Sequence, residues 1–343
     1  MSARHIIRLT GFDDPRLSRA AWDALVARSA SDVVFLTWAW QSAWWEVFGR
    51  GELLLIAAEQ DGAVVALAPL FTEAGMIYPV GSGGSDYLDF SGDTSEPGML
   101  VALLDHARQC VKDFIGFVFY HLPEASANSA RLAAAAAKLG VSIFEEGDQP
   151  APAMDLRGQP ELAQEATRKK SLVRHEKFFA RDDALRVFHA RTAAEILPHL
   201  DDFFAQHRAR WADTPSPSLF CDDAQQRFYR RVTELASGDG WLRFTRVEWN
   251  GRPIAYHFGF CFHGSFLWYK PSYDVALAKH SPGEVLLRQL LLVAIAEGAH
   301  LFDFGLGDEA FKARFATHVR RVKNFGLYAP EKISNSQPVI HGS

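Results

Sequence analysis

Short apolar runs alternate with longer amphipathic stretches along the first half of the chain, as in mixed α/β proteins. Apolar positions recur at helical spacing over 16–28, and Thr37 is placed to cap a second, aromatic-rich helix that ends near Trp45. The dipeptide Asp61-Gly62 favours a tight turn, so we predict a β-hairpin from the strands 53–58 and 63–71. Further along, the pattern predicts a strand at 76–80, a turn at 81–84, a helix at 99–111 and a buried strand at 115–120.

The second half of the chain repeats this order of elements. Asn250-Gly251 lies 189 residues after Asp61-Gly62 and separates two further apolar runs, 241–249 and 253–262. After them we predict a strand at 266–270, a helix at 284–297, and a strand at 301–304 that lies about 185 residues after 117–120. Three elements in one order at nearly one offset indicate a duplicated α/β lobe, with chance recurrence of a common order as the alternative.

The stretch between the halves sets the expected domain boundaries. It begins with the proline-containing segment 149–152 and a short strand at 153–156, and a strongly basic segment follows. We expect an N-terminal lobe at 1–157, a basic linker helix at 158–182, a C-terminal lobe at 183–328 and a disordered tail at 329–343.

The basic segment stands out against a chain whose formal net charge is −5. Six basic residues face one acid, Glu176, between positions 168 and 181. On a helix, four of them would share one face, because their spacing is 4, 3 and 4: Lys170, Arg174, Lys177 and Arg181. This face is either a solvated linker surface or a track for phosphates of a cofactor, a nucleotide-linked acceptor or a tRNA end.

Composition narrows the class of protein. The chain has 343 residues, enough for two domains, and with 48% hydrophobic residues it is neither disordered nor fibrous. Three separated cysteines, Cys110, Cys221 and Cys261, form no metal-binding motif and predict reduced thiols. No apolar run approaches the roughly 20 residues that span a bilayer, so we expect a cytoplasmic protein. Aromatic residues make up 13% of the chain, and we expect them chiefly in the core.

Several common catalytic motifs are missing. Gly81 to Gly84 follow a predicted strand, but the residues after them do not form a helix pattern, so they do not fit a dinucleotide-binding loop. The sequence has no phosphate-binding P-loop, no nucleophile elbow and no zinc-protease motif, and we expect no metal.

The strongest chemical signal lies at 302–315. A predicted buried strand carries Asp303 between two phenylalanines, and a two-glycine loop then presents Asp308. A carboxylate in apolar surroundings is a candidate general base, because burial raises its pKa. Lys312 follows four residues after Asp308 and would orient a carboxylate or meet developing negative charge. The same loop also presents Glu309, and the alternative for Asp308 is a helix cap that forms a salt bridge with Lys312.

Two weaker polar clusters accompany this signal. Asp86, Tyr87 and Asp89 lie in one loop and could bind a cationic or hydroxylated acceptor, or simply form a turn. Ser281, Pro282 and Gly283 open a predicted helix, whose free N–H groups are suited to a pyrophosphate, although Ser-Pro is also an ordinary helix start.

Together these segments resemble the GNAT superfamily, and within it the CelD/BcsL-type acetyltransferases linked to bacterial cellulose biosynthesis, which are relatives of the FemAB peptidyltransferases. The resemblance covers nearly the whole chain and rests on the segments 35–49, 81–90, 168–181, 280–291 and 302–316. It implies an α/β fold of mixed sheets, with two tandem GNAT-like lobes, an acyl-donor site in the C-terminal lobe and an acceptor cleft between the lobes.

The resemblance also implies roles for individual residues. Ser281, Pro282 and Gly283 fall where GNAT enzymes place the pyrophosphate loop of an acyl-CoA, and Lys170 and Arg174 would add phosphate contacts. Lys312 falls where FemAB-like enzymes carry a lysine that assists acyl transfer. The catalytic candidates are Asp303, Asp308 and Lys312, and the substrate-binding candidates are Asp86, Tyr87, Asp89 and Tyr269.

We therefore expect an acetyl-CoA- or other acyl-CoA-dependent N-acyltransferase that acts on an amine of a sugar, peptide or cell-envelope precursor. A carboxylate would remove the ammonium proton, and Lys312 would stabilise the oxyanion. The alternatives are a FemAB-like aminoacyl-tRNA-dependent transferase and a non-catalytic protein on a decayed GNAT fold. The expected partner is a small or cell-envelope acceptor and not DNA; tRNA binding and a homodimer stay open.

Overall fold

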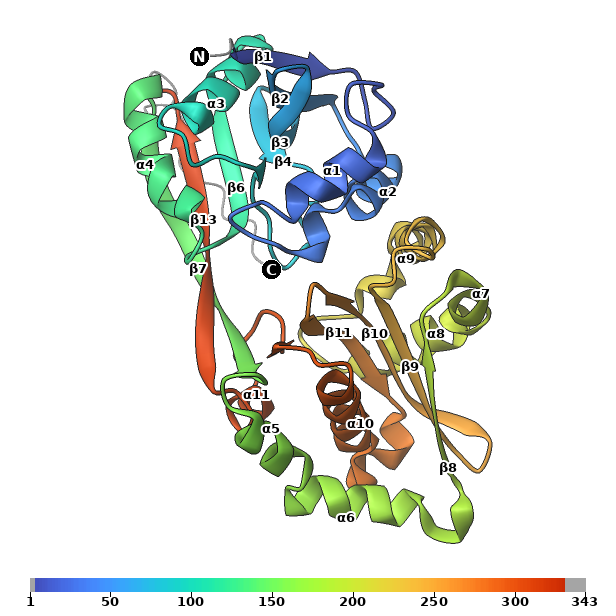
Figure 1. Ribbon diagram of the computed structural model, residues 1–343. Coiled ribbons are helices and arrows are strands. Elements are labelled where there is room, and N and C mark those ends of the chain that lie inside the picture. Colours follow the sequence, from blue (N-terminus) through green and yellow to red (C-terminus); the bar gives the residue numbers. More distant parts are fainter. Residues whose placement is uncertain (1–3, 331–343) are drawn as a thin grey trace. The chain divides into compact units, whose positions relative to one another are not determined.

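The computed structural model describes residues 4–330, which form two compact units (Figure 1). Unit 1 contains the residues up to Pro150 and those from Arg320, and unit 2 is Ala151–Val319. The chain leaves unit 1 within strand β7 (Ser142–Asp155) and returns within β13 (His318–Tyr328). We placed 183–328 in one C-terminal lobe, but 322–328 pair with a strand of unit 1, whose backbone groups they satisfy. From residue 331 on, the predicted tail lies outside the described residues.

The sheet of unit 1 has the strand order β1-β2-β3-β4-β6-β13, with β5 paired to β3. Neighbouring strands are antiparallel, except for the parallel pair β4 and β6. The predicted hairpin is confirmed, and its turn residues Asp61 and Gly62 both have left-handed φ angles, 53° and 75°. The bounds are β1 (Arg4–Leu9), β2 (Glu52–Gln60), β3 (Ala63–Glu73), β4 (Met76–Pro79), β5 (Ser91–Gly92) and β6 (Gly116–Pro123).

The helices of unit 1 bury the aromatic-rich segment and cover the sheet. The side chain of Thr37 accepts the N–H of Trp40 at 3.4 Å, which confirms the predicted cap. Trp40 and Trp44 are at most 5% exposed and belong to the core. Leucines of α3 and α4 pack with Phe117 of β6 in one apolar cluster. The bounds are α1 (Arg19–Val26), α2 (Trp38–Phe48), α3 (Met99–Gln109) and α4 (Ala127–Leu139).

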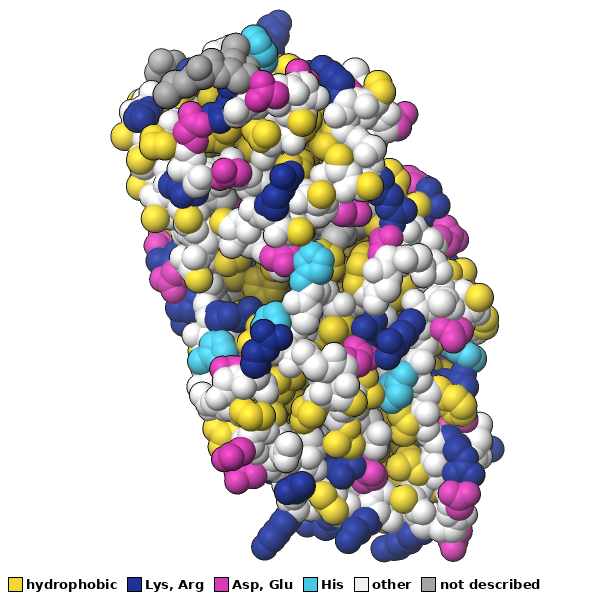
Figure 2. Space-filling view, in the orientation of Figure 1, with side chains coloured by type: hydrophobic (Ala, Val, Ile, Leu, Met, Phe, Trp, Pro, Cys, Tyr) yellow, Lys and Arg dark blue, Asp and Glu magenta, His cyan; other side chains and the backbone are white. Residues whose placement is uncertain are grey.

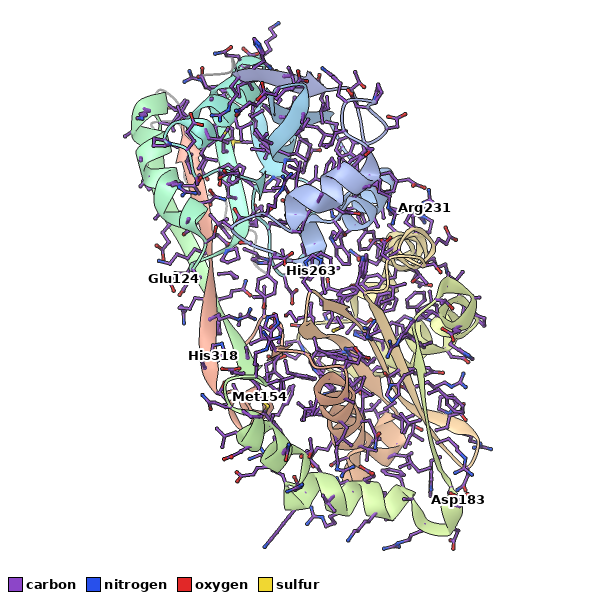
Figure 3. The ribbon with its side chains drawn as sticks, in the orientation of Figure 1. Glu124, Met154, Asp183, Arg231, His263 and His318 are labelled. Atoms are coloured by element: carbon purple, nitrogen blue, oxygen red, sulfur yellow. The ribbon has the colours of Figure 1, made fainter. Side chains whose placement is uncertain are left out.

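The sheet of unit 2 has the strand order β7-β12-β11-β10-β9-β8. Only β11 and β12 are parallel in this order, within the described part of the chain. Met154 of β7, labelled in Figure 3, pairs with Phe302 of β12. The strand bounds are β8 (Leu185–Ala190), β9 (Leu242–Trp249), β10 (Arg252–Phe262), β11 (Ser265–Tyr273) and β12 (Leu301–Asp303).

Two groups of helices enclose the core of unit 2. One apolar cluster joins β10, β11 and β12 to α5, α6 and α10, and an aromatic cluster that includes Phe203, Tyr229 and Phe258 joins α8 and α9 to β10. The bounds are α5 (Pro160–Thr167), α6 (Lys170–Phe179), α7 (Ala193–Ile196), α8 (Leu200–Trp211), α9 (Asp223–Leu235), α10 (Pro282–Ala296) and α11 (Ala310–Ala313). No helix among residues 4–330 is both long and apolar enough to cross a membrane.

Each unit contains the same succession of elements. In unit 1 a hairpin, β2 and β3, leads to β4, helix α3 and then β6, which runs parallel to β4. In unit 2 the hairpin β9 and β10 leads to β11, helix α10 and then β12, which runs parallel to β11. The protein is therefore a mixed α/β protein with duplicated lobes, as the offset of the two hairpins predicted.

The predicted single linker helix at 158–182 is two helices. Lys169 has an extended ψ of 132° and separates α5 from α6. Lys170, Arg174 and Lys177 lie on α6, but Arg181 lies beyond its end. The helix stops there because Asp182 and Asp183 both adopt left-handed φ angles of 56°, which aspartate tolerates better than most residues.

Candidate active site

Asp303 ends β12 and lies between β11 and β7. It pairs with Leu267 of β11 and Ala153 of β7 and is only 3% exposed. Its Oδ1 accepts the N–H of Gly305 at 2.9 Å, so the carboxylate is held in one orientation. The rings of Phe302 and Phe304 lie 5.0 Å apart and belong to the apolar cluster of unit 2.

Lys312 lies on the short helix α11 and is 3% exposed. Its Nζ donates to the carbonyl of Leu306 at 2.5 Å and to Oε2 of Glu309 at 2.7 Å. Two of the three N–H donors of the ammonium are thus used by neighbouring residues, and one remains for another acceptor. A buried cation with a spare donor is suited to stabilise negative charge.

The structure corrects the predicted partner of Lys312. The alternative interpretation of Asp308 was a salt bridge to Lys312, four residues later, but Asp308 is exposed and the pair forms with Glu309. The reason is the path of the loop. Gly305 and Gly307 have φ angles of 70° and 111°, so the helix begins only at Ala310, and Asp308 lies outside its spacing.

Gly307 is required for this arrangement. A Cβ atom at position 307 would lie 2.4 Å from Oε2 of Glu309 and 3.3 Å from Nζ of Lys312. The first distance is far below van der Waals contact, so any side chain would displace the ion pair.

The strand β11 carries a bulge next to this loop. Phe258 of β10 pairs with Lys270, but Phe260 pairs with Leu267, so two residues of β11 oppose Gly259. The N–H of Tyr269 donates to Nε2 of His257 at 3.2 Å, in place of a strand partner. His257 is fully buried, and burial lowers its pKa to about 3, which keeps the ring neutral and able to accept this bond.

Tyr269, a predicted substrate-binding residue, is largely enclosed. It is 7% exposed, its ring centroid lies 5.3 Å from that of Phe260, and the ammonium of Lys270 lies 4.0 Å from the centroid of Tyr269. Its N–H group marks the bulge, whereas its ring belongs to the aromatic cluster of α8 and α9. At the bulge, residues 268 and 269 therefore contribute backbone groups, and the phenol of Tyr269 lies in the aromatic cluster.

Strands β11 and β12 separate beside Asp303. Their parallel pairing ends with Leu267 and Asp303, although β11 continues to Tyr273. The next residue, Phe304, turns away and donates its N–H to the carbonyl of Pro152 at 3.0 Å. In residues 4–330, no backbone hydrogen bond joins 268–273 to the chain that follows Asp303.

In unit 1 the corresponding strands also separate, but the chain fills the gap. The pairing of β4 with β6 ends at Ile77 and Phe117. The N–H of Leu88 then donates to the carbonyl of His121 on β6 at 3.1 Å. The side chains of Leu88 and Phe90 line the small cavity that remains. Among residues 4–330, no segment after Asp303 therefore bridges these strands of unit 2 as Leu88 does in unit 1.

The helix α10 begins with the predicted pyrophosphate loop. Ser281 has a left-handed φ of 53°, Pro282 occupies the first helical position, and Gly283 lies against the ring of Tyr273. A carboxylate, Glu284, already lies in the first turn and is paired with Arg314 at 3.0 Å. The local charge at this helix end is therefore close to neutral before any phosphate binds.

Of the two predicted phosphate-binding residues of α6, Arg174 is the one that the structure connects to this helix end. A guanidinium N–H of Arg174 donates to Nε2 of His175 at 3.0 Å, and Nδ1 of His175 lies 3.8 Å from Glu284. The structure therefore brings Arg174 to the start of α10. Lys170 is exposed at the start of α6, and Figure 2 shows Lys and Arg side chains gathered over this helix.

The unit 1 candidates have different surroundings. Asp89 is 6% exposed and accepts four hydrogen bonds from its own chain, so the structure gives it a structural role instead of the predicted acceptor contact. Tyr87 is 4% exposed and accepts a hydrogen bond from Arg320 at 3.1 Å, and Asp86 is half-buried. The donors to Asp89 are Ser31, Ser126, Asn128 and the N–H of Phe90.

The sequence analysis did not identify three residues of the unit 2 site: His257, His175 and Glu284. Each acts through a residue distant in sequence, so no local pattern marks it. For His257 a signal existed, because Gly259 interrupts a β-strand two residues later, and an isolated glycine in a strand indicates a bulge. No group of three or more metal-binding side chains occurs within residues 4–330.

The comparisons with known proteins agree with this geometry. Residues 166–313 match a family model described as an acetyltransferase (GNAT) domain. Unit 2 therefore contains a GNAT acetyltransferase domain, and the protein is an acyltransferase. The comparison with curated proteins found no match.

Solved structures are similar over nearly the whole chain. FemX has a TM-score of 0.64 and 11% identity, and the similarity covers 90% of this chain and 96% of FemX. A conserved protein of unknown function from Bacteroides thetaiotaomicron VPI-5482 has a TM-score of 0.57 and 13% identity, covering 91% and 98%. L-PGS from Bacillus licheniformis has a TM-score of 0.53 and 12% identity, covering 85% and 91%. At these identities the likeness concerns the fold alone.

Proposed function

We propose that this acyltransferase moves an acyl group from an acyl-CoA to an amino group of a sugar, peptide or cell-envelope precursor by direct attack of the amine on the thioester. The observation that carries the proposal is the buried ammonium of Lys312, which retains a spare N–H donor on the short helix that follows β12. A free strand edge can pair with the amide groups of an extended pantetheine arm.

We assign the proton transfer to Asp303. An amine is protonated near neutral pH, so a base must remove a proton before the nitrogen attacks. Asp303 is buried and oriented by Gly305, whereas Asp308, the alternative base, is exposed. The ammonium proton passes to Asp303 directly or through water.

Lys312 acts on the charge that develops next. As the nitrogen–carbon bond forms, the carbonyl oxygen becomes negative, and the third N–H of Lys312 donates to it. The carbon–sulfur bond then breaks, and CoA leaves as the thiolate. Glu309 holds Lys312 in place during both steps, because it pairs with Nζ from the preceding turn.

We assign the phosphates of the donor to the start of α10. Ser281, Pro282 and Gly283 present this helix end, and Arg174 approaches it through His175. Arg314 offsets the carboxylate of Glu284, which would otherwise repel a phosphate. Lys170 adds a positive charge at the exposed start of α6.

The narrower CelD/BcsL type, with acetyl-CoA as the donor and a role in exopolysaccharide formation, belongs to the same proposal. Its support is the motif 302–316, in which Asp303 and Lys312 lie beside one loop. A polysaccharide precursor would need a free amino group, such as that of an amino sugar, to be the acceptor in this chemistry.

The alternative is an aminoacyl-tRNA-dependent transferase of the FemAB type. The exposed basic residues Lys170, Arg174 and Lys177 of α6 favour it, because such a face suits a phosphate backbone. Charged tRNA would then bind with an affinity that falls steeply as salt rises, and acyl-CoA would not be consumed.

The test is release of free thiol from acetyl-CoA with D-glucosamine and, separately, a short peptide as acceptor. We expect thiol release by the wild-type protein and a loss of about a hundredfold or more in Asp303→Asn and Lys312→Ala, with both variants still unfolding cooperatively. Lys138→Ala, an exposed lysine on α4, is the matched control. Full activity in both site variants would exclude this assignment, and turnover only with charged tRNA would favour the alternative.

A further inference from the structure

His121 of unit 1 has an unusual backbone conformation. It lies on β6 with a φ of 53°, and among residues 4–330 it is the one non-glycine residue with a left-handed φ inside a β-strand. The strand β6 ends at Pro123, just before Glu124, which is labelled in Figure 3. Such strained residues persist where the surroundings hold them, and they concentrate at functional sites.

A β-bulge re-aims this residue. Lys323 of β13 pairs with Leu122, but Phe325 pairs with Phe119, so two residues of β6, His121 among them, oppose Asn324. The N–H of His121 donates to Oδ1 of Asn324 at 2.9 Å instead of to a backbone carbonyl.

The rest of His121 is also held. Its carbonyl accepts the N–H of Leu88 at 3.1 Å, and Nδ1 lies 2.7 Å from the carbonyl of Ser85. The side chain of Ser85 is in turn fixed by the indole N–H of Trp40 at 2.9 Å. A carbonyl only accepts, so Nδ1 carries the hydrogen, and in the neutral form of an imidazole Nε2 then presents a lone pair. Within residues 4–330, no hydrogen bond to this Nε2 is formed.

The duplication of the lobes supplies a comparison. When 117–120 of β6 are set against 301–304 around β12, position 121 matches Gly305 of unit 2. Gly305 also has a left-handed φ, 70°, and its N–H also donates to a side-chain Oδ1, that of Asp303. In both lobes a residue with a left-handed φ donates its N–H to a side chain at this position. In unit 1 this residue carries an imidazole, whereas in unit 2 it is a glycine. Glycine would adopt this backbone conformation more easily, so the feature that histidine adds at this position is its ring.

The neighbours of His121 suit a ligand rich in hydrogen-bond donors. Ser85, which holds the ring, is followed by the half-buried carboxylate of Asp86 and by Tyr87, whose hydroxyl is held by Arg320. An imidazole lone pair and a carboxylate both accept hydrogen bonds. An amino sugar presents an ammonium and several hydroxyls in fixed directions, whereas a peptide N-terminus presents one ammonium.

We propose that unit 1 binds an amino sugar, and that Nε2 of His121 accepts a hydrogen bond from one of its hydroxyl groups. This inference rests on the proposed function for the class of ligand, since an amine is the expected acceptor. His121 is a binding residue of unit 1, and the acyl-transfer chemistry stays with Asp303 and Lys312.

The test uses the full chain labelled with ¹⁵N at histidine, with D-glucosamine as the probe and no acyl-CoA present. The His121 signals are identified by their loss in His121→Gly, which keeps the backbone conformation. We expect Nδ1 protonated and Nε2 unprotonated in the free protein, and a shift of Nε2 when D-glucosamine is added. Loss of this one hydrogen bond should weaken D-glucosamine binding about tenfold in His121→Gly.

Two further measurements keep the result unambiguous. Lys312→Ala should bind D-glucosamine as the wild type does, so a failure of acyl transfer leaves this test unaffected. His121→Gly should melt near the wild-type temperature, because glycine relieves the strain at φ 53°. No Nε2 shift with D-glucosamine, equal binding by wild type and His121→Gly, or a larger shift with D-alanyl-D-alanine would each overturn the proposal.

Discussion

Replacing Lys312 with methionine separates the catalytic role of the buried ammonium from its structural role. Methionine keeps the unbranched length and apolar volume but removes the charge and all three N–H donors. The wild-type side chain is 4% exposed and bonds to Leu306 and Glu309. The variant therefore leaves the carbonyl of Leu306 without its donor. It also leaves the half-exposed carboxylate of Glu309 without its ion-pair partner.

The expected effect on stability is small. Burying an ammonium costs several kcal/mol, which the ion pair and the carbonyl bond offset, and exchange for an apolar side chain of similar size is often neutral. The remaining cost is the unsatisfied carbonyl of Leu306, so we expect a loss of about 1–2 kcal/mol in the free energy of unfolding.

The expected effect on catalysis is much larger. Removal of one oxyanion donor lowers kcat by about 10²–10³, or about 3–4 kcal/mol in the activation barrier. KM for the acyl donor should change little, because Lys312 is assigned to the transition state and not to the phosphates.

The assay pairs two measurements on one preparation: thiol release from acetyl-CoA, and unfolding by urea. Lys138→Met on α4, which replaces an exposed lysine, controls for the loss of a positive charge. Wild-type kcat in Lys312→Met would refute the catalytic role. A loss of activity no greater than the loss of folded protein would show that Lys312 is structural.

Three further predictions follow from the buried groups. Gly307→Ala places a Cβ 2.4 Å from Glu309 at a φ of 111°, so we expect a loss of about 1–3 kcal/mol in urea unfolding together with reduced kcat; wild-type values for both would contradict the required glycine. Burial raises the pKa of Asp89, so stability should fall as pH rises through its unfolded value of 3.8, and this dependence should vanish in Asp89→Asn. Burial lowers the pKa of His207 and His257 from 6.5 to about 3. As pH falls from 7 to 5.5, these histidines are therefore protonated in the unfolded chain but not in the folded protein. Each of them should lower the free energy of unfolding by about 1.4 kcal/mol over this range. His257→Gln should show a shallower pH dependence than wild type in urea unfolding, and an unchanged slope would contradict the buried neutral ring.

Much of the fold was predictable because its signals are local. Asp61-Gly62 and Asn250-Gly251 both adopt the left-handed turns that their residue types favour, and the strands on either side pair as predicted. The burial of Asp303 also followed from the apolar residues on either side of it in one short segment. These features depend on neighbours in the chain, which a sequence displays directly.

Parts of the site were not predictable because they depend on the path of the chain in space. Glu309, and not Asp308, pairs with Lys312, since two glycines delay the start of the helix. The sequence suggested that Asp89 binds the acceptor substrate, but its carboxylate accepts hydrogen bonds from two other segments of the chain. The strained His121 is held by Asn324, about two hundred residues later in the sequence.

The sequence by itself determined that the chain is a duplicated α/β protein with a carboxylate and a lysine in one short segment, because turn residues and apolar periodicity act over a few positions. Only the tertiary structure decided which strand edge is free and which polar atoms are already satisfied. In unit 2 the backbone of β11 beyond Leu267 has no partner from the chain after Asp303 among residues 4–330, whereas in unit 1 Leu88 fills the matching gap. That difference arises from contacts between distant segments, and it places the proposed acyl-donor site in unit 2.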